Sequence, residues 1–217
     1  VSINTSAGSA LQIKGNVEAA VTIHLTGTNS LITKNNYNAG LQKDNKAQLI
    51  IKTNDSDTTA GILNARSIDG DGAGIGGGLH GSCSNITIDS GSVIASSKYG
   101  AGIGGGKGYG GSCKNITING GSVKASSVSG SPTNEGKEVY CCTIENPENA
   151  NVTIKPGTGN WKPVNHSSLD PDDTNLYVWL PKLESNSTNS YLIILDPENG
   201  SESRTRNYSF DTVTNTF

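Results

Sequence analysis

Short stretches of alternating apolar and polar residues recur along the first 130 positions of the chain. In VTIHL, residues 21–25, the apolar Val21, Ile23 and Leu25 alternate with polar residues, and NITI and GSVIAS have the same period of two. This period is typical of a half-buried strand. The sequences DSG and NGG separate such segments, and their Asn and Gly tolerate the left-handed backbone of turns. No segment has the sustained i, i+3, i+4 apolar spacing of an amphipathic helix, so the pattern predicts strands throughout.

The alternation lies within a repeat. The heptapeptide GAGIGGG occupies residues 72–78 and returns at residues 100–106, and GSC, NITI and GSV follow it in both copies. The offset between the copies grows from 28 to 30 residues through two additional residues in KGYGGSC, which marks that segment as a loop. More diverged copies at residues 58–67, 38–53 and 21–33 bring the total to about four coils of roughly 28 to 35 residues.

These features predict an all-β fold, a right-handed parallel β-helix in which strand, turn, strand and Gly-rich corner repeat once per coil. Equivalent residues of successive coils would lie about 4.8 Å apart. The handedness follows the general preference of crossover connections. In this arrangement Ile75 and Ile103 point into the core, and the flanking glycines let stacked backbones approach closely.

A second interpretation of the glycine segment is a nucleotide-binding loop, because GAGIGG formally satisfies G-x-G-x-x-G. That motif needs a preceding strand, a following helix and an acidic residue further on. Here a Cys-bearing loop and a strand follow, and the segment is duplicated in register. The structural interpretation of the glycines is therefore preferred.

We assign residues 1–130 to the parallel β-helix repeats and residues 131–217 to C-terminal β coils or a cap continuous with the solenoid. The periodicity stops near Ser131, and residues 146–173 are rich in Pro, Gly and Asn and are expected to be largely loop. Strands are expected at residues 139–144, 176–181, 190–196 and 207–214. They would cover the open end of the helix, where an exposed edge invites association.

The four cysteines lie at positions 83, 113, 141 and 142, without the CxxC spacing of a zinc site. Cys83 and Cys113 occupy equivalent positions of neighbouring coils, within reach of a disulfide. A ladder of unbonded buried thiols fits as well, and the sequence leaves both open. Cys141 or Cys142 could continue that ladder, and a strained vicinal disulfide between them is the remaining alternative.

The composition suits a repeat protein with a thin core. Hydrophobic residues make up 33% of the chain, charged residues 16%, and the net charge is −3. A solenoid needs only a thin core of aliphatic ladders, which explains the low hydrophobic content. The chain has no basic patch for nucleic acid and no apolar run long enough to span a membrane. We expect an extracellular or cell-surface location, where disulfides persist; a reduced cytosolic protein with free buried cysteines is the alternative. The absence of Met indicates a mature or excised segment.

The repeated GAGIGGG…GSC-NITI-GGSV-AS, preceded by VTIHLTGTNSLI, resembles the Gly-rich β-helical repeats of bacterial cell-surface proteins, which are adhesin-like or carbohydrate-binding domain-containing. The later segments GSPTNEGKEVYCCTI and TNLYVWLPK resemble those that follow the repeats in such proteins. The resemblance implies a parallel β-helix at the cell surface and adhesion through glycan or polysaccharide binding. It supplies no catalytic residues.

Candidate sugar-binding residues lie beside the Gly-rich corner. Exposed aromatic rings stack on the apolar faces of sugars while polar neighbours form hydrogen bonds. Tyr99 ends one coil and Tyr109 lies in the inserted loop of the next. Lys98 and Lys107 are close in sequence, and the four residues are expected to form one patch. Trp161 is a second candidate. Each aromatic residue could instead cover the rim of a coil.

Polysaccharide lyases and hydrolases also use parallel β-helices, so a calcium-dependent enzyme acting on polysaccharides is an alternative. Such enzymes need a carboxylate pair in one cleft or calcium beside acidic ligands. Asp69 and Asp71 in SIDGDG resemble part of a calcium loop, but the remaining ligands are missing, and a turn formed by Asp-Gly is the simpler interpretation. The histidines at 24, 80 and 166 are scattered. We therefore predict a protein that is not an enzyme and retain calcium as the candidate cofactor.

A structural spacer or filament subunit without a small ligand, contacting other surface proteins, is the other alternative. Tyrosines gathered in one exposed place favour glycan binding, whereas a featureless shaft favours a structural role.

Overall fold

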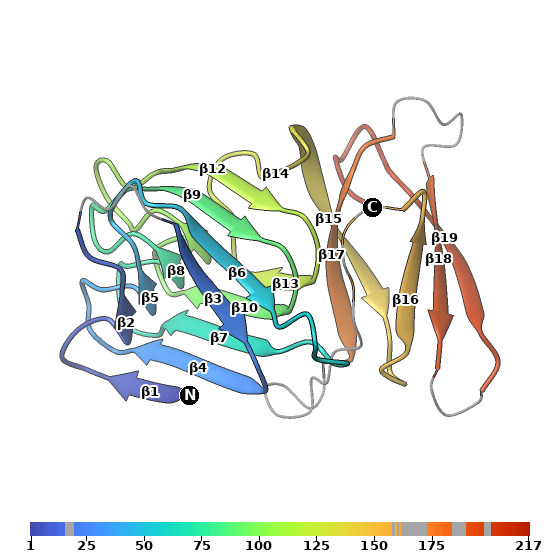
Figure 1. The fold of residues 1–217 in the computed structure, drawn as a ribbon. Coiled ribbons are helices and arrows are strands. Elements are labelled where there is room, and N and C mark those ends of the chain that lie inside the picture. The colour runs from blue at the N-terminus through green and yellow to red at the C-terminus, as the bar shows by residue number, and fades with distance from the viewer. Residues whose placement is uncertain (16–19, 158, 160, 162–172, 184–189, 198–200) are drawn as a thin grey trace.

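The computed structural model describes residues 1–15, 20–157, 159, 161, 173–183, 190–197 and 201–217. Within these residues every regular element is a strand. A solenoid of parallel strands occupies the N-terminal part of the molecule, and a smaller group of antiparallel strands follows at one end (Figure 1). No helix among the described residues is long and apolar enough to cross a membrane.

The solenoid has three sheets of parallel strands; the first four coils contribute one strand to each sheet, and the last coil contributes strands to the first and third. The first sheet contains β1 (Ser2–Thr5), β4 (Thr28–Thr33), β7 (Ile62–Ser67), β10 (Ser92–Ser97) and β13 (Ser122–Ala125). The second contains the two-residue strands β2 (Leu11–Gln12), β5 (Leu41–Gln42), β8 (Ile75–Gly76) and β11 (Ile103–Gly104). The third contains β3 (Val21–Leu25), β6 (Leu49–Thr53), β9 (Cys83–Ile88), β12 (Cys113–Ile118) and β14 (Thr133–Asn134). The predicted parallel β-helix is therefore confirmed.

Aliphatic ladders fill the solenoid. Leu41 pairs with Ile75 and Ile75 with Ile103, and all three side chains are fully buried. Val93 pairs with both Leu63 and Val123, as the alignment of the repeats predicts. Burying one such side chain contributes about 1.5–3 kcal/mol. Stacking of modest aliphatic residues thus supplies a continuous core without large aromatic side chains.

The glycine corner depends on close approach between stacked coils. Gly76 has a φ of +131°, and a Cβ at this position would lie 2.0 Å from the carbonyl oxygen of Gly104. The neighbouring Ile75 points inward, and its N–H donates to Gly102 of the next coil at 2.9 Å. GAGIGGG is repeated because each copy stacks directly on its neighbour, as predicted.

Asparagines of the two NITI segments also stack. Asn85 and Asn115 have φ angles of 59° and 55°, a left-handed conformation that Asn adopts more readily than most residues. The Nδ2 of Asn115 donates to Oδ1 of Asn85 at 3.0 Å, and Nδ2 of Asn85 donates to the carbonyl oxygen of Lys46 at 2.8 Å. The amide ladder therefore fixes the register of three coils.

The cysteines divide into one bond and two free thiols. Cys83 and Cys113 form a disulfide between neighbouring coils, with their Cα atoms 4.4 Å apart, so the disulfide alternative is the one present. Cys141 and Cys142 are free. The expectation that one of them continues the ladder is wrong, because β15 (Lys137–Glu145), which carries them, reverses direction and runs antiparallel to β14. They also form no vicinal disulfide.

Antiparallel strands follow the solenoid. β15 pairs with β17 (Asn175–Pro181), and β18 (Ser190–Asp196) pairs on either side with β16 (Asn151–Lys155) and β19 (Arg204–Ser209). Between these two groups lies a second core, which contains Cys142, Ile144, Ala150, Val152, Ile154, Leu176, Val178, Leu180, Tyr191, Ile193 and Leu195. β15 and β17 stand between the end of the solenoid and the strands of this last sheet (Figure 1).

Two expectations about this region need correction. Residues 151–155 form β16 rather than loop, because Val152 and Ile154 face the second core; residues 162–172 of the expected loop lie outside the described residues. The last strand ends at Ser209 rather than near residue 214. Asp211 there accepts the N–H of Val213 at 2.8 Å and turns the chain.

β15 and β17 pack against the end of the solenoid. Val139 belongs to the solenoid core, and Trp179 packs against the same core. The indole Nε1 of Trp179 donates to the carbonyl oxygen of Val123 at 3.0 Å. These contacts cover the last coil with apolar surface and satisfy a backbone acceptor of β13.

Candidate functional site

The exposed aromatic side chains among the described residues gather on one corner of the solenoid. Tyr37, Tyr99 and Tyr109 are 63%, 53% and 97% exposed. Tyr37 lies between β4 and β5, Tyr99 between β10 and β11, and Tyr109 between β11 and β12. They are therefore carried by the loops on either side of the narrow second sheet.

Backbone hydrogen bonds hold these loops to one another. The N–H of Leu79 donates to the carbonyl oxygen of Tyr37 at 2.8 Å, and the N–H of His80 donates to that of Lys107 at 3.0 Å. The N–H of Lys107 in turn donates to the carbonyl oxygen of Asp71 at 2.7 Å. The loops of three successive coils thus form one continuous surface.

Side-chain contacts join Tyr99 to two lysines. The Nζ atoms of Lys107 and Lys98 lie 4.6 Å and 5.2 Å from the centroid of the Tyr99 ring, within the range of a cation–π contact. The Nζ of Lys107 also lies 3.5 Å from Oδ1 of Asp71. The structure therefore brings Lys98, Tyr99 and Lys107 together as the sequence predicts, and adds Asp71 as a partner of Lys107.

Tyr109 belongs to the same surface through its loop. It lies between Gly108 and Gly110, and a Cβ built at Gly108 would lie 2.3 Å from Nδ1 of His80. His80 therefore packs directly against the Tyr109 loop. We call this surface the corner patch; its residues are Tyr37, Asp71, His80, Lys98, Tyr99, Lys107 and Tyr109.

Sequence reasoning missed Tyr37. Leu41 pairs with Ile75, so the same offset aligns Tyr37 with Asp71. The sequence contains the same alignment: two small residues and an aliphatic one occur at residues 39–41 and again at residues 73–75. Extending the alignment two residues back from Ala39 would have placed Tyr37 beside the predicted patch.

The candidate metal ligands do not form a metal cluster. Asp69 is exposed, and Asp71 is paired with Lys107. Across the described ranges, no three His, Cys, Asp or Glu residues lie close enough together to hold a metal ion. Residues 170–173, DPDD, are a further acidic run. Asp170 and Asp172 lie outside the described residues, and Asp173 accepts the N–H of Asn175.

Trp161 does not have the exposure that a stacking platform needs. It is half-buried and packs against the second core. A Cβ at Gly159 would lie 2.3 Å from its ring. Its role is therefore to fill the side of the C-terminal core.

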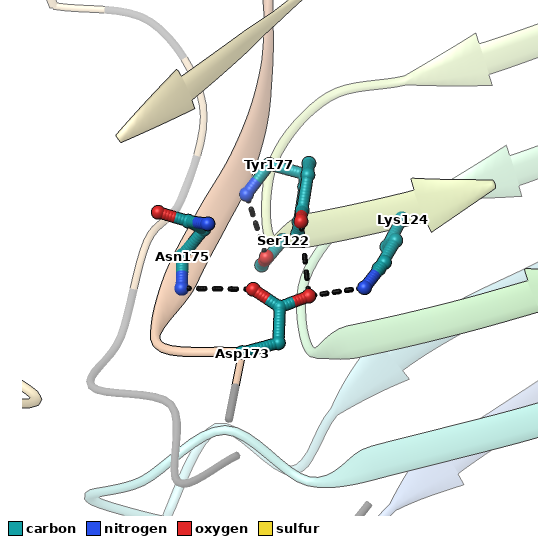
Figure 2. A network of polar contacts seen from close by, with 5 residues as sticks. All are labelled: Ser122, Lys124, Asp173, Asn175 and Tyr177. Atoms are coloured by element: carbon teal, nitrogen blue, oxygen red, sulfur yellow. Dashed lines mark hydrogen bonds and ion pairs between the residues drawn. The ribbon is translucent and has the colours of Figure 1, made fainter. Parts of the chain in front are cut away.

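A second polar cluster joins the solenoid to the strands that follow it. The carboxylate of Asp173 is at its centre (Figure 2). It accepts a hydrogen bond from Nζ of Lys124 on β13, one from the hydroxyl of Tyr177 at 2.9 Å and one from the N–H of Asn175 at 3.1 Å. The N–H of Tyr177 donates to Oγ of Ser122 at 2.9 Å. The cluster links β13 to β17.

Asp173 and Lys124 form an ion pair in which both groups favour their charged forms. Burial alone would raise the pKa of Asp173, but the hydrogen bonds from Lys124, Asn175 and Tyr177 lower it below its usual value. The hydrogen bond to Asp173 raises the pKa of Lys124. Both shifts favour the charged forms, whereas a general acid or base works best with a pKa near the operating pH.

Lys43 is a buried lysine that the sequence did not single out. Its side chain is fully buried between the second and third coils, and burial lowers its pKa to about 8. Its Nζ donates to the carbonyl oxygens of Ser84 at 2.6 Å and Asn45 at 2.9 Å. Lys43 therefore bridges two coils, and its ammonium group is shielded from solvent.

A shallow depression of about 290 Å³ lies beside the first two coils, and it is lined by Gln12, Ile13, Lys14, Gly15, Asp44 and Asn45. Among its described lining residues Asp44 is the single carboxylate, and it already accepts the N–H of Gly78 at 2.8 Å. Hydrolysis of a glycosidic bond generally requires a pair of carboxyl groups. The described lining residues do not supply such a pair.

Comparison with known families agrees with this fold. A family model described as Beta helix repeat matches residues 86–107 and 116–131, which begin in β9 and end before β14. Searches of the curated proteins and of the solved structures found no match. Since parallel β-helices occur in enzymes and in non-enzymes, the function has to be argued from the surface of this chain.

Proposed function

We propose that this chain is a non-catalytic module of a secreted or cell-surface protein that mediates adhesion by binding a glycan or polysaccharide at the corner patch. The observation that carries the proposal is the gathering of Tyr37, Tyr99 and Tyr109 on interlocked loops of one corner. Isolated exposed apolar residues are normal on a protein surface. Three tyrosines in one place, with lysine, aspartate and histidine beside them, indicate a binding surface.

The patch combines the two kinds of contact that a sugar needs. A tyrosine ring offers an apolar face and a hydroxyl group, and the side chains of Lys98, Lys107 and His80 can form hydrogen bonds with sugar hydroxyls. The patch crosses several coils, so a linear polymer can lie along the axis of the solenoid. Because backbone hydrogen bonds fix the loops, little ordering is needed when a ligand binds, which favours affinity.

The proposed location rests on two features. The Cys83–Cys113 disulfide suits an oxidising compartment such as the cell exterior. The resemblance of the repeats to Gly-rich bacterial surface proteins points to the same place. Adhesion is the role that combines this location with a glycan-binding surface.

A retention assay tests the proposal. The purified chain is applied to soluble and insoluble polysaccharides and host glycans, with calcium and with a chelator. We expect saturable retention on at least one class, weakened about tenfold or more by Tyr37→Ala or Tyr109→Ala, the size of a typical hot-spot loss. Val213→Ala is the matched control, because Val213 is also an exposed apolar residue but lies in the C-terminal turn.

Two outcomes would contradict the proposal. If a folded sample is retained on none of the glycans, the structural spacer or filament subunit takes its place. If calcium causes release of soluble fragments from a polysaccharide, the chain is a lyase or hydrolase.

A further inference from the structure

We infer that the corner patch selects acidic polysaccharides, those whose sugars carry carboxylate or sulfate groups. This inference rests on the proposed function, since it names the class of glycan that the patch would bind. Three features support it: the lysines around Tyr99, the equivalent lysine two coils away and the carboxylate that competes for one of them.

Two ammonium groups border a single ring. The Nζ atoms of Lys98 and Lys107 lie 5.2 Å and 4.6 Å from the centroid of Tyr99. A neutral sugar that stacked on Tyr99 would have to displace one or both ammonium groups from the ring. An acidic sugar avoids this loss, because its anionic group accepts hydrogen bonds from the same ammonium groups while its apolar face contacts the ring.

A third lysine continues the row. Thr33 pairs with Ser67 and Ser67 pairs with Ser97, so Lys34 and Lys98 follow equivalent residues two coils apart. That separation is about 10 Å, twice the spacing of neighbouring strands. Lys34 is exposed, and Tyr37 lies three residues beyond it. A regular polyanion could therefore meet a lysine at two points along the solenoid, each close in sequence to an exposed tyrosine.

Asp71 opposes this attraction. Its Oδ1 lies 3.5 Å from Nζ of Lys107, so it competes with an anionic ligand for that ammonium group and repels the ligand. Among the described ion pairs, Lys98 has no carboxylate partner. Asp69 and Asp44 are exposed carboxylates of the neighbouring loops, and Asp44 already accepts the N–H of Gly78 at 2.8 Å. Removing the charge of Asp71 should therefore strengthen binding of an acidic polymer and leave binding of a neutral one unchanged.

Affinity electrophoresis of the whole chain tests the inference, with polygalacturonate as the carboxylated polymer, dextran sulfate as the sulfated one and dextran as the neutral one. We expect the dissociation constant for at least one acidic polymer to be ten times lower than for dextran, and to rise with added salt, which screens charges. We expect Asp71→Asn to bind the acidic polymer several-fold more tightly. We expect Lys98→Met combined with Lys107→Met to bind it about tenfold more weakly.

A matched double variant distinguishes the effect of the lysines in the corner patch from the effect of the net charge of the chain. Lys137→Met combined with Lys155→Met also removes two exposed lysines, but from β15 and β16; it should bind all three polymers like the parent chain. Retention on one acidic polymer and not the other would support the inference and identify the anionic group.

The inference is overturned, with the proposed function intact, if dextran binds as tightly as both acidic polymers and its binding depends on Tyr37 and Tyr109. It is also overturned if Asp71→Asn leaves acidic binding unchanged. Failure of the proposed function is a different result, because then no polymer, acidic or neutral, retards the folded chain.

Discussion

At the scale of single residues, the contact between Gly76 and Gly104 sets the spacing of the coils at the glycine corner. Gly76 combines a φ of +131° with a space in which a Cβ would lie 2.0 Å from a backbone oxygen. The opposing atom is backbone, so it cannot move aside without separating the coils. The corner that carries the tyrosine loops therefore depends on a position where only glycine fits.

Replacement of Gly76 by Ala should lower the free energy of unfolding by at least about 2 kcal/mol, because it adds backbone strain and a steric conflict. Chemical denaturation measures this. Gly8→Ala is the matched control: a Cβ there meets nothing within 4 Å, so its effect should stay within about 1 kcal/mol. Equal stability of the two variants would show that the coils are not held at this distance.

The residue scale also shows where sequence reasoning succeeded and failed. Ile75, Ile103 and the Tyr99–lysine group were predictable, because two nearly identical repeats fixed their register. Tyr37 belongs to a diverged copy and was missed for that reason. Lys43 was missed because a lysine in LQKDN suggests a solvated turn, whereas two carbonyl oxygens bind its ammonium group inside the solenoid.

At the scale of elements, the junction of β13 and β17 depends on Asp173. Its carboxylate accepts three hydrogen bonds, from Lys124, Asn175 and Tyr177, and its side chain is only 12% exposed. Elements of this region were harder to predict than the coils. β16 has a single pair of inward apolar residues, Val152 and Ile154, among Asn and Pro, and no repeat to confirm it.

Asp173→Asn should lower the free energy of unfolding by about 1–3 kcal/mol at neutral pH, since it weakens hydrogen bonds to a charged acceptor. The pKa of Asp173 is lowered in the folded chain, so the carboxylate stabilises the fold above its unfolded pKa of about 3.9. This stabilisation is lost as the pH falls through the folded pKa, and the difference between the parent chain and the variant should vanish there.

Denaturation curves of both proteins from neutral to acidic pH provide the test. Asp55→Asn is the control, because its pair with Lys52 is exposed and should contribute less than about 1 kcal/mol. A difference between parent and Asp173→Asn that persists unchanged in acid would contradict the ion pair.

At the scale of the whole molecule, the repetition of one coil along a single axis explains why the solenoid could be predicted. The C-terminal strands lack such repetition and were harder to predict. Each coil of the solenoid repeats the environment of the previous one, so one correct alignment gives sheet order, register and the position of the loops. The C-terminal strands have no such symmetry. Their pairing joins segments as far apart as β16 and β18, which no local pattern specifies.

The same architecture places the tyrosines in two separate groups. Of the seven tyrosines, Tyr37, Tyr99 and Tyr109 lie on the corner patch, and the other four lie on β15, β17, β18 and β19: Tyr140, Tyr177, Tyr191 and Tyr208. One labelled residue type therefore reports on both halves of the molecule.

The most direct measurement is a nuclear magnetic resonance titration of the chain carrying ¹³C-labelled tyrosine, with polygalacturonate or dextran fragments, whichever the retention assay selects. If the corner patch binds the glycan, the signals of Tyr37, Tyr99 and Tyr109 will shift saturably while the four C-terminal tyrosines keep their positions. Shifts confined to the C-terminal tyrosines, or none at a saturating concentration, would contradict the assignment of glycan binding to this corner.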